Sequence, residues 1–153
     1  MKCSPAPNGW SCLANAFAMA LDIPIHEIFK SVGHDGSEII WKDLPEPFNR
    51  RSFHIQEMVA MCRRRFGLYV TEYQAVYALA PTGYNVDPLV RPNLGVMEQM
   101  LSLEIHDGVL TGFSGKMPHA VAWDGYEKMI YDAGGCCYSI DKFSIQSFWC
   151  FSR

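Results

Sequence analysis

The chain has 153 residues, enough for one domain with its own hydrophobic core. Hydrophobic residues make up 49% of the sequence and charged residues 19%, a composition that excludes intrinsic disorder. The formal net charge is -3, and the only basic run is the three arginines at 63–65. The sequence therefore lacks the basic patch that binding to nucleic acid or to an anionic membrane requires. We therefore expect a single domain over residues 1–153 that binds neither nucleic acid nor membranes.

The sequence also lacks the usual signals for membrane insertion, secretion and metal binding. No apolar run reaches the roughly 18 residues of a spanning helix, and the N-terminus has no signal-peptide core, so we expect a cytoplasmic protein. The six cysteines, at positions 3, 12, 62, 136, 137 and 150, are too few for a disulfide scaffold and are expected to be thiols. Their spacing contains no pair of C-x2-C motifs, so we expect no metal and no cofactor.

The first predicted element is a helix at the centre of the fold. Ser11 is a suitable N-cap for a helix that reaches about residue 21. The side chains of this helix are small and apolar on nearly all sides, which predicts a buried position. Pro24 ends it, and a short helix is expected near residues 26–30.

A loop, a second helix and a strand are expected next. Residues 33–49 contain glycines and prolines and are predicted to be a loop. Ser52 is the expected cap of a helix over residues 53–66, which Gly67 ends. Residues 68–73 alternate as a strand does.

The remaining chain is predicted to contain one helix and several strands. Residues 75–80 are ambiguous, whereas 81–92 form a loop whose length suggests a function such as covering a cleft. A third helix is expected over 94–103. Strands are expected over residues 108–113, 119–124, 127–132 and 138–140, with a last segment over 143–151. Helices first and antiparallel strands later predict the α+β class.

Cys12 is the first candidate for chemistry. It follows the predicted helix cap, where backbone N–H groups and the positive end of the helix dipole converge. This position lowers the pKa of a thiol and holds the nucleophilic thiolate. The same N–H groups can stabilise an oxyanion on an attacked carbonyl. The alternative is a buried apolar cysteine, the commonest fate of a free thiol.

His119 and Asp132 are predicted to meet on neighbouring strands of a hairpin. A two-residue turn at 124–125 pairs His119 with Ile130, and a four-residue turn pairs it with Asp132 directly. In both registers the two side chains share one face of the sheet, opposite or diagonal to each other. Asp124 faces the other way, so Asp132 is the expected partner that orients the imidazole. The alternatives are a structural strand histidine and a turn aspartate.

The order of these residues resembles that of papain-like cysteine peptidases. The closer resemblance is to compact bacterial peptidase domains that cleave double-glycine leader peptides. It implies a papain-like fold, in which an N-terminal helical part with a central cysteine-bearing helix packs on a C-terminal antiparallel sheet. It also implies a catalytic triad of Cys12, His119 and Asp132. The matching positions are Cys12-Leu13-Ala14-Asn15-Ala16, His119-Ala120-Val121, Gly125, Ile130-Tyr131-Asp132, Gly134 and Phe148-Trp149.

The chain departs from that family's pattern at three places. Leu13 stands where glycine commonly follows the nucleophile, and Ala133 stands where proline commonly follows the aspartate. The family also places a glutamine several residues before the cysteine to donate to the oxyanion. Here Asn8 is the only amide upstream of Cys12, so Asn8 or backbone N–H groups are the expected oxyanion donors.

Two functions follow as hypotheses. The first is a cysteine hydrolase or related acyl transferase that acts on a peptide or isopeptide bond of a protein or peptide substrate, with Trp10 and Trp123 as cleft or core residues. The second is a catalytically inactive papain-like domain that acts as an inhibitor or adaptor, of a kind that bacteriophages also encode, and binds a host protein. The missing upstream glutamine favours the second hypothesis, and the retained Cys12, His119 and Asp132 favour the first. A third, metal-binding reading of the cysteines is disfavoured by their spacing.

Overall fold

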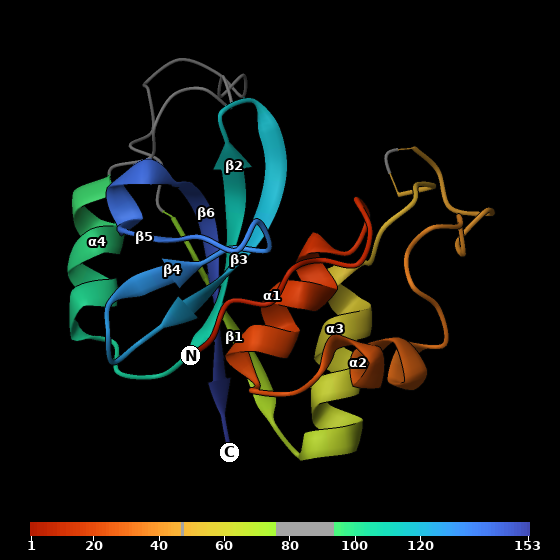
Figure 1. Ribbon diagram of the computed structural model, residues 1–153, viewed down its shortest axis with the longest axis horizontal. Helices are drawn as coiled ribbons and strands as arrows, with labels where there is room; N and C mark the ends of the chain where they lie inside the picture. The colour runs from red at the N-terminus through yellow and green to blue at the C-terminus, as the bar shows by residue number, and fades with distance from the viewer. Residues whose placement is uncertain (47, 76–93) are drawn as a thin grey trace.

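The computed structural model describes residues 1–46, 48–75 and 94–153. Within these ranges, helices lie on both faces of one six-stranded antiparallel sheet, whose strand order is β1-β6-β2-β3-β4-β5 (Figure 1). The strands are β1 (Tyr69–Gln74), β2 (Gly108–Ser114), β3 (Met117–Asp124), β4 (Met129–Tyr131), β5 (Cys137–Tyr138) and β6 (Ser144–Ser152). The predicted α+β class is confirmed.

The N-terminal helix α1 (Cys12–Ala20) is central, as predicted. Every residue after Cys12 in this helix is buried, because small side chains let it pack between the sheet and the other helices. Ser11 occupies the N-cap position but makes no capping hydrogen bond. Its hydroxyl donates instead to the carbonyl of Asn8 at 3.1 Å, so the expected cap interaction is wrong although the helix start is right.

Two further helices pack near α1. The helix α2 (Ile25–Val32) starts after Pro24, and α3 (Ile55–Met61) continues into a π-helical turn (Cys62–Phe66) that Gly67 ends with a φ of 66°. The predicted N-cap of α3, Ser52, is wrong by two residues. His54 is the N-cap, and its N–H donates to Glu57 at 2.7 Å, whereas Ser52 has a φ of 94° in the preceding loop.

The sheet separates two hydrophobic clusters. On one face, α1, α2 and α3 cover residues such as Val109 and Ala122. On the other face, the helix α4 (Leu94–Leu103) covers Leu110 and Trp123. Figure 1 shows α4 on the left of the sheet and the three N-terminal helices on its right. Neighbours along one strand therefore enter different clusters, as the period of two in a strand requires.

The hairpin formed by β3 and β4 has a register that differs from both predicted ones. Asp124 pairs with Met129 and Trp123 with Ile130, so residues 125–128 form the connection. This register is shifted by two residues from the closer prediction, and the shift preserves parity. Asp132 consequently lies beyond the end of β4 and diagonal to His119, on the same side of the sheet.

The other predicted elements are found with small shifts in their ends. The segment expected as a strand over 138–140 contains β5 and then a 3₁₀ turn (Ile140–Lys142), and the last segment is β6. Of the ambiguous segment 75–80 only Ala75 is described, and the loop expected over 81–92 lies outside the described residues. No single described helix is long and apolar enough to cross a membrane; α1 and α2 meet the length and composition criterion only as a pair, bent by 117°.

Candidate functional site

Cys12 lies at the first position of α1, where the helix begins beside β3. Its half-buried sulfur faces the imidazole of His119 and the backbone N–H groups of Ala120 and Leu13. Burial alone raises the pKa of the Cys12 thiol, but hydrogen bonding to His119, the nearby positive charge of His119 and the two backbone N–H groups outweigh burial and lower it. The site therefore favours a thiolate at Cys12.

His119 projects from β3 between Cys12 and Asp132. Its Nε2 atom lies 2.9 Å from Oδ1 of Asp132, which leaves Nδ1 for the thiol. The hydrogen bond to Cys12 and the interactions with Asp132 raise the pKa of His119 to about 9, although burial opposes this shift. Opposite pKa shifts in the two partners favour a thiolate–imidazolium pair at neutral pH.

Asp132 is held in place from a second side. The hydroxyl of Tyr138, on β5, donates to Oδ2 of Asp132 at 2.9 Å, and the N–H of Gly134 approaches Oδ1 at 3.4 Å. Burial raises the pKa of Asp132, but the hydrogen bonds from His119 and Tyr138 lower it below its ordinary value. The carboxylate is therefore charged and fixed, as an orienting partner of an imidazole must be. Sequence reasoning missed Tyr138, because nothing local shows that β5 returns beside β4.

A comparison with Cys62 shows how strongly the surroundings of Cys12 affect its thiol pKa. Cys62 is fully buried in the helical layer, and burial raises the pKa of its thiol to about 12. Burial also raises the pKa of Cys150, to about 11. All six cysteines are free thiols. Among Cys12, Cys62 and Cys150, only Cys12 has a lowered pKa. Hydrogen bonding to His119 and backbone N–H groups accounts for the difference.

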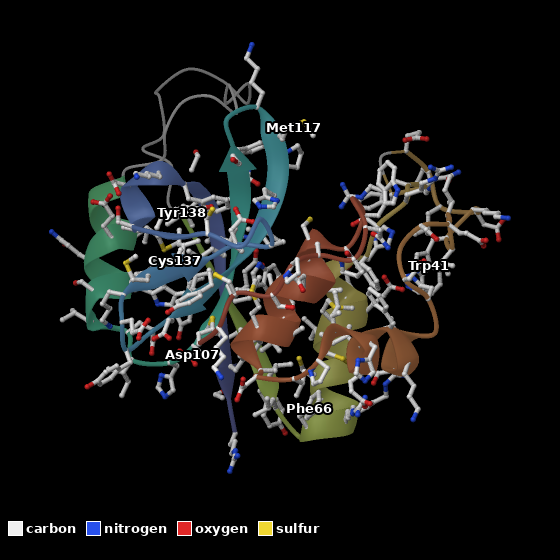
Figure 2. All side chains as sticks on the ribbon, viewed as in Figure 1. Trp41, Phe66, Asp107, Met117, Cys137 and Tyr138 are labelled. Carbon is white, nitrogen blue, oxygen red and sulfur yellow. The ribbon has the colours of Figure 1, made fainter. Side chains whose placement is uncertain are left out.

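Cys12 and His119 open onto a cleft of about 570 Å³. One wall comes from the segment before α1 and the loop before α3, and the other from β2, β3 and β6. Met117, at the tip of the β2–β3 hairpin, lies at this cleft (Figure 2). Trp10 also lines the cleft, whereas Trp123 is only 2% exposed and belongs to the core. The lining residues are Gly9, Trp10, Cys12, Leu13, Arg50, Arg51, Ser52, Phe53, Thr111, Gly112, Met117, Pro118, His119, Ala120 and Gln146.

Asn8 does not line this cleft. Its side-chain nitrogen donates to the carbonyl of Asp35 at 3.1 Å, and its side-chain oxygen accepts from the N–H of Trp10 at 2.9 Å. Both ends of the amide therefore hold the loop before α1. The structure brings together Cys12, His119 and Asp132 of the expected site residues, and it leaves Asn8 outside the group.

Gln146 is an amide that sequence reasoning missed. Gly112 pairs with Ile145 while Thr111 pairs with Ser147, so Gln146 is the extra residue of a β-bulge in β6. The bulge directs Gln146 into the cleft that holds Cys12. Its side chain makes no hydrogen bond to another residue in the described ranges. No sequence pattern marks this bulge, since it arises where β6 pairs with distant strands.

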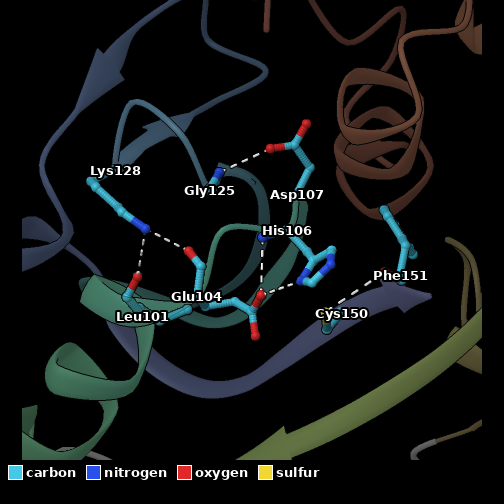
Figure 3. A network of polar contacts seen from close by, with 8 residues as sticks. All are labelled: Leu101, Glu104, His106, Asp107, Gly125, Lys128, Cys150 and Phe151. Carbon is cyan, nitrogen blue, oxygen red and sulfur yellow. Dashed lines mark hydrogen bonds and ion pairs between the residues drawn. The ribbon is translucent and has the colours of Figure 1, made fainter.

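A second cluster of polar groups lies away from the cleft (Figure 3). Glu104, His106 and Cys150 offer ligand atoms that lie within 4.8 Å of one another, the one such group of three found among the described residues. In the present arrangement Glu104 is hydrogen-bonded to both the N–H and the ring of His106. The ammonium of Lys128 also donates to the backbone carbonyl of Glu104, so a cation already sits beside this cluster.

Scans of the chain against family models, curated proteins and solved structures give no match.

Proposed function

We propose that this protein is a cysteine hydrolase that cleaves a peptide or isopeptide bond, with Cys12 as nucleophile, His119 as acid and base, and Asp132 as the residue that orients His119. One observation carries the proposal: Cys12 faces the imidazole of His119 in a cleft, and the other side of that imidazole is hydrogen-bonded to Asp132 at 2.9 Å. A buried structural cysteine needs neither an imidazole nor an open cleft.

The proposed reaction begins with the thiolate–imidazolium pair. The Cys12 sulfur attacks the carbonyl carbon of the bond, and the electron pair of the carbonyl moves to its oxygen. The imidazolium of His119 then donates its proton to the departing amine nitrogen as the C–N bond breaks. This step leaves a thioester on Cys12 and a neutral imidazole.

Water completes the cycle. Neutral His119 takes a proton from a water molecule, and the resulting hydroxide oxygen attacks the thioester carbonyl. The C–S bond breaks, the carboxylic acid product leaves, and the thiolate–imidazolium pair is restored. Asp132 stabilises the imidazolium in each state in which His119 carries two protons.

The oxyanion requires donors on the cleft side of Cys12. The N–H of Cys12 belongs to the first turn of α1 and makes no hydrogen bond to another backbone group in the described ranges. Gln146, on β6, lines the same cleft and carries a side-chain amide. We assign these two groups to the oxyanion in place of Asn8.

The papain-like arrangement remains part of this proposal. In its support, the cysteine-bearing helix packs on β3, the strand that carries the histidine, and the aspartate follows the next strand. Cys12, His119 and Asp132 follow one another along the chain in the order that the catalytic residues have in papain-like cysteine peptidases. The resemblance of these motifs to those of the double-glycine leader peptidases suggests a peptide substrate, bound in an extended form along the cleft.

A peptide-cleavage screen tests the proposed activity. The protein is incubated with a digest of a bacterial proteome that was prepared with a protease of known specificity, and new peptide termini are identified by mass spectrometry. We expect termini that appear with the wild-type protein and with Cys150→Ser, but not with Cys12→Ala or His119→Ala. Equal termini from the wild-type protein and Cys12→Ala would rule out Cys12 as the nucleophile.

One observation favours the non-catalytic alternative as a second candidate. The loop before α3 exposes large apolar side chains, among them Trp41 (Figure 2) and Phe48, which are 45% and 51% exposed. Large apolar side chains that one loop exposes to solvent can serve as a protein-binding surface. Under this alternative the domain binds a partner protein and has no cleavage activity that a substitution could remove. Cys12 is then dispensable, and Cys12→Ala retains full partner binding.

A further inference from the structure

Apart from the Cys12 thiolate, which pairs with the imidazolium of His119, the charges that line the described cleft are positive. Its described lining contains Arg50 and Arg51 and, at the reacting centre, His119, whose raised pKa keeps it cationic; no aspartate or glutamate lines it. The chain as a whole has a formal net charge of -3. A positively lined cleft on an acidic protein concentrates anionic ligands over Cys12.

Arg51 is positioned next to the nucleophile's own segment. Its guanidinium carbon lies 5.3 Å from the centre of the Trp10 ring, and Trp10 is two residues before Cys12 in the sequence. A cation–π contact of this kind holds the guanidinium over the ring and does not use up its N–H donors. These donors match the geometry of a carboxylate.

Arg50 and Arg51 are available to a ligand. Both are exposed, and neither belongs to an ion pair with another residue in the described ranges. Arg65 offers a contrast, because its guanidinium is occupied by Glu27 at the helical surface. Within the described ranges, therefore, no carboxylate neutralises the charge of either cleft arginine.

We propose that the cleft holds a carboxylate-binding subsite, formed by Arg50 and by Arg51 stacked on Trp10, which selects acidic peptide substrates. This inference rests on the proposed function, since it takes the cleft to be the place where substrate binds. The carboxylate is either the side chain of an aspartate or glutamate near the bond that is cleaved or the C-terminus of a short peptide. Both sources offer the same group to the guanidinium edge.

A pair of alkylating reagents tests the subsite at the nucleophile. Iodoacetate and iodoacetamide are similar in size and differ by a carboxylate, so the ratio of their rates at Cys12 reports the local potential. We expect this ratio to fall several-fold in the double variant Arg50→Gln, Arg51→Gln and to fall also when salt is raised to about 0.5 M. The matched control Arg63→Gln, Arg64→Gln, on the π-helical turn, should leave the ratio unchanged.

The two proposals fail in different ways. A ratio that is the same in the wild-type protein and in Arg50→Gln, Arg51→Gln, with rapid alkylation in both, overturns the subsite and leaves the catalytic proposal standing. A Cys12 that reacts no faster than the exposed Cys136 overturns the catalytic proposal instead. A binding measurement then decides the subsite without any chemistry.

That measurement uses the Cys12→Ser protein and pairs of synthetic hexapeptides. Each pair differs only in glutamate against glutamine, or in a free against an amidated C-terminus. The fraction of each peptide retained with the protein is read by ultrafiltration and mass spectrometry. We expect one acidic member to be retained several-fold more than its neutral partner, and this preference to disappear in the Arg50→Gln, Arg51→Gln background. The pair that shows the preference identifies the source of the carboxylate, and equal retention within every pair overturns the subsite.

Discussion

The hydroxyl of Tyr138 donates to Oδ2 of Asp132 at 2.9 Å, while Oδ1 of the same carboxylate lies 2.9 Å from Nε2 of His119. Each carboxylate oxygen thus has its own partner, one on β5 and one on β3. This arrangement fixes the rotation of the carboxylate and, through it, the plane of the imidazole. Tyr138 acts through Asp132 and is therefore a positioning residue.

Tyr138→Phe tests this positioning role. The change removes one hydrogen bond to a charged group and keeps the ring, so we expect the rate of peptide cleavage to fall by about tenfold, equivalent to roughly 1.4 kcal/mol. The alkaline limb of the pH–rate profile should also move, because the Tyr138 hydroxyl helps to set both the position and the effective charge of Asp132. Steady-state cleavage rates from pH 6 to 10 measure both effects. Unchanged rate and profile would assign Tyr138 to packing alone.

The pH dependence of cleavage follows from the opposite pKa shifts of Cys12 and His119. The pKa of His119 is raised from 6.5 to about 9, so its imidazolium persists at neutral pH and is lost as pH rises through about 9. The pKa of Cys12 is lowered, so its thiolate is lost only as pH falls through this lowered value. We expect a bell-shaped profile with an alkaline limb near pH 9.

Asp132→Asn checks the origin of the alkaline limb. Asp132 contributes to the raised pKa of His119 by a hydrogen bond and by its charge, and asparagine keeps the size without the charge. The alkaline limb should therefore move to lower pH in this variant, in addition to a loss of rate. A limb that stays near pH 9 in Asp132→Asn would show that Asp132 does not contribute to the raised pKa of His119.

Gln146→Ala tests the assignment of the oxyanion donor. The loss of one such donor lowers turnover by about 10² to 10³, and we expect an effect of this size on the cleavage rate. The rate of Cys12 alkylation should change little, because Gln146 takes no part in the thiolate–imidazolium pair. Asn8→Ala is the matched control and should retain most of the cleavage rate. The reverse result, with Asn8→Ala the damaging change, would restore the upstream amide as donor.

Gly112→Ala tests how the sheet builds the cleft. A Cβ atom at Gly112 would lie 2.0 Å from the backbone carbonyl oxygen of Ser144 and 3.1 Å from the nitrogen of Gln146. Because backbone atoms cannot move aside as a side chain does, β2 and β6 must separate at the bulge. We expect a loss of about 1–3 kcal/mol in the free energy of unfolding, measured by urea denaturation. Gly9→Ala, with open space around its Cβ, is the control and should unfold like the wild-type protein.

Local patterns were sufficient to predict the main elements of the fold. The apolar helix that starts at Cys12 and the third helix over 94–103 are both confirmed, because their packing follows directly from composition. The hairpin prediction is wrong in register and right in parity, and parity alone decides that His119 and Asp132 share a side. The candidate triad was therefore accessible from sequence spacing.

Other features depend on contacts between distant segments. Ser52 is a better intrinsic cap than His54, but the carboxylate of Glu57 reaches back to the N–H of His54 and sets the helix start. Gln146 and Tyr138 enter the site through a bulge and through the return of β5 beside β4. Neither the bulge nor the pairing has a local signature, so neither residue was predictable.

The most direct test of the central claim is competitive alkylation of the six thiols at about pH 6. The native protein is treated with limiting iodoacetamide, and modified peptides are quantified by mass spectrometry. The account predicts that Cys12 is modified much faster than the exposed Cys136 and Cys137, and that His119→Ala abolishes this preference. If Cys12 in the wild-type protein reacts no faster than those thiols, it is a structural cysteine, and the proposed hydrolase mechanism is contradicted.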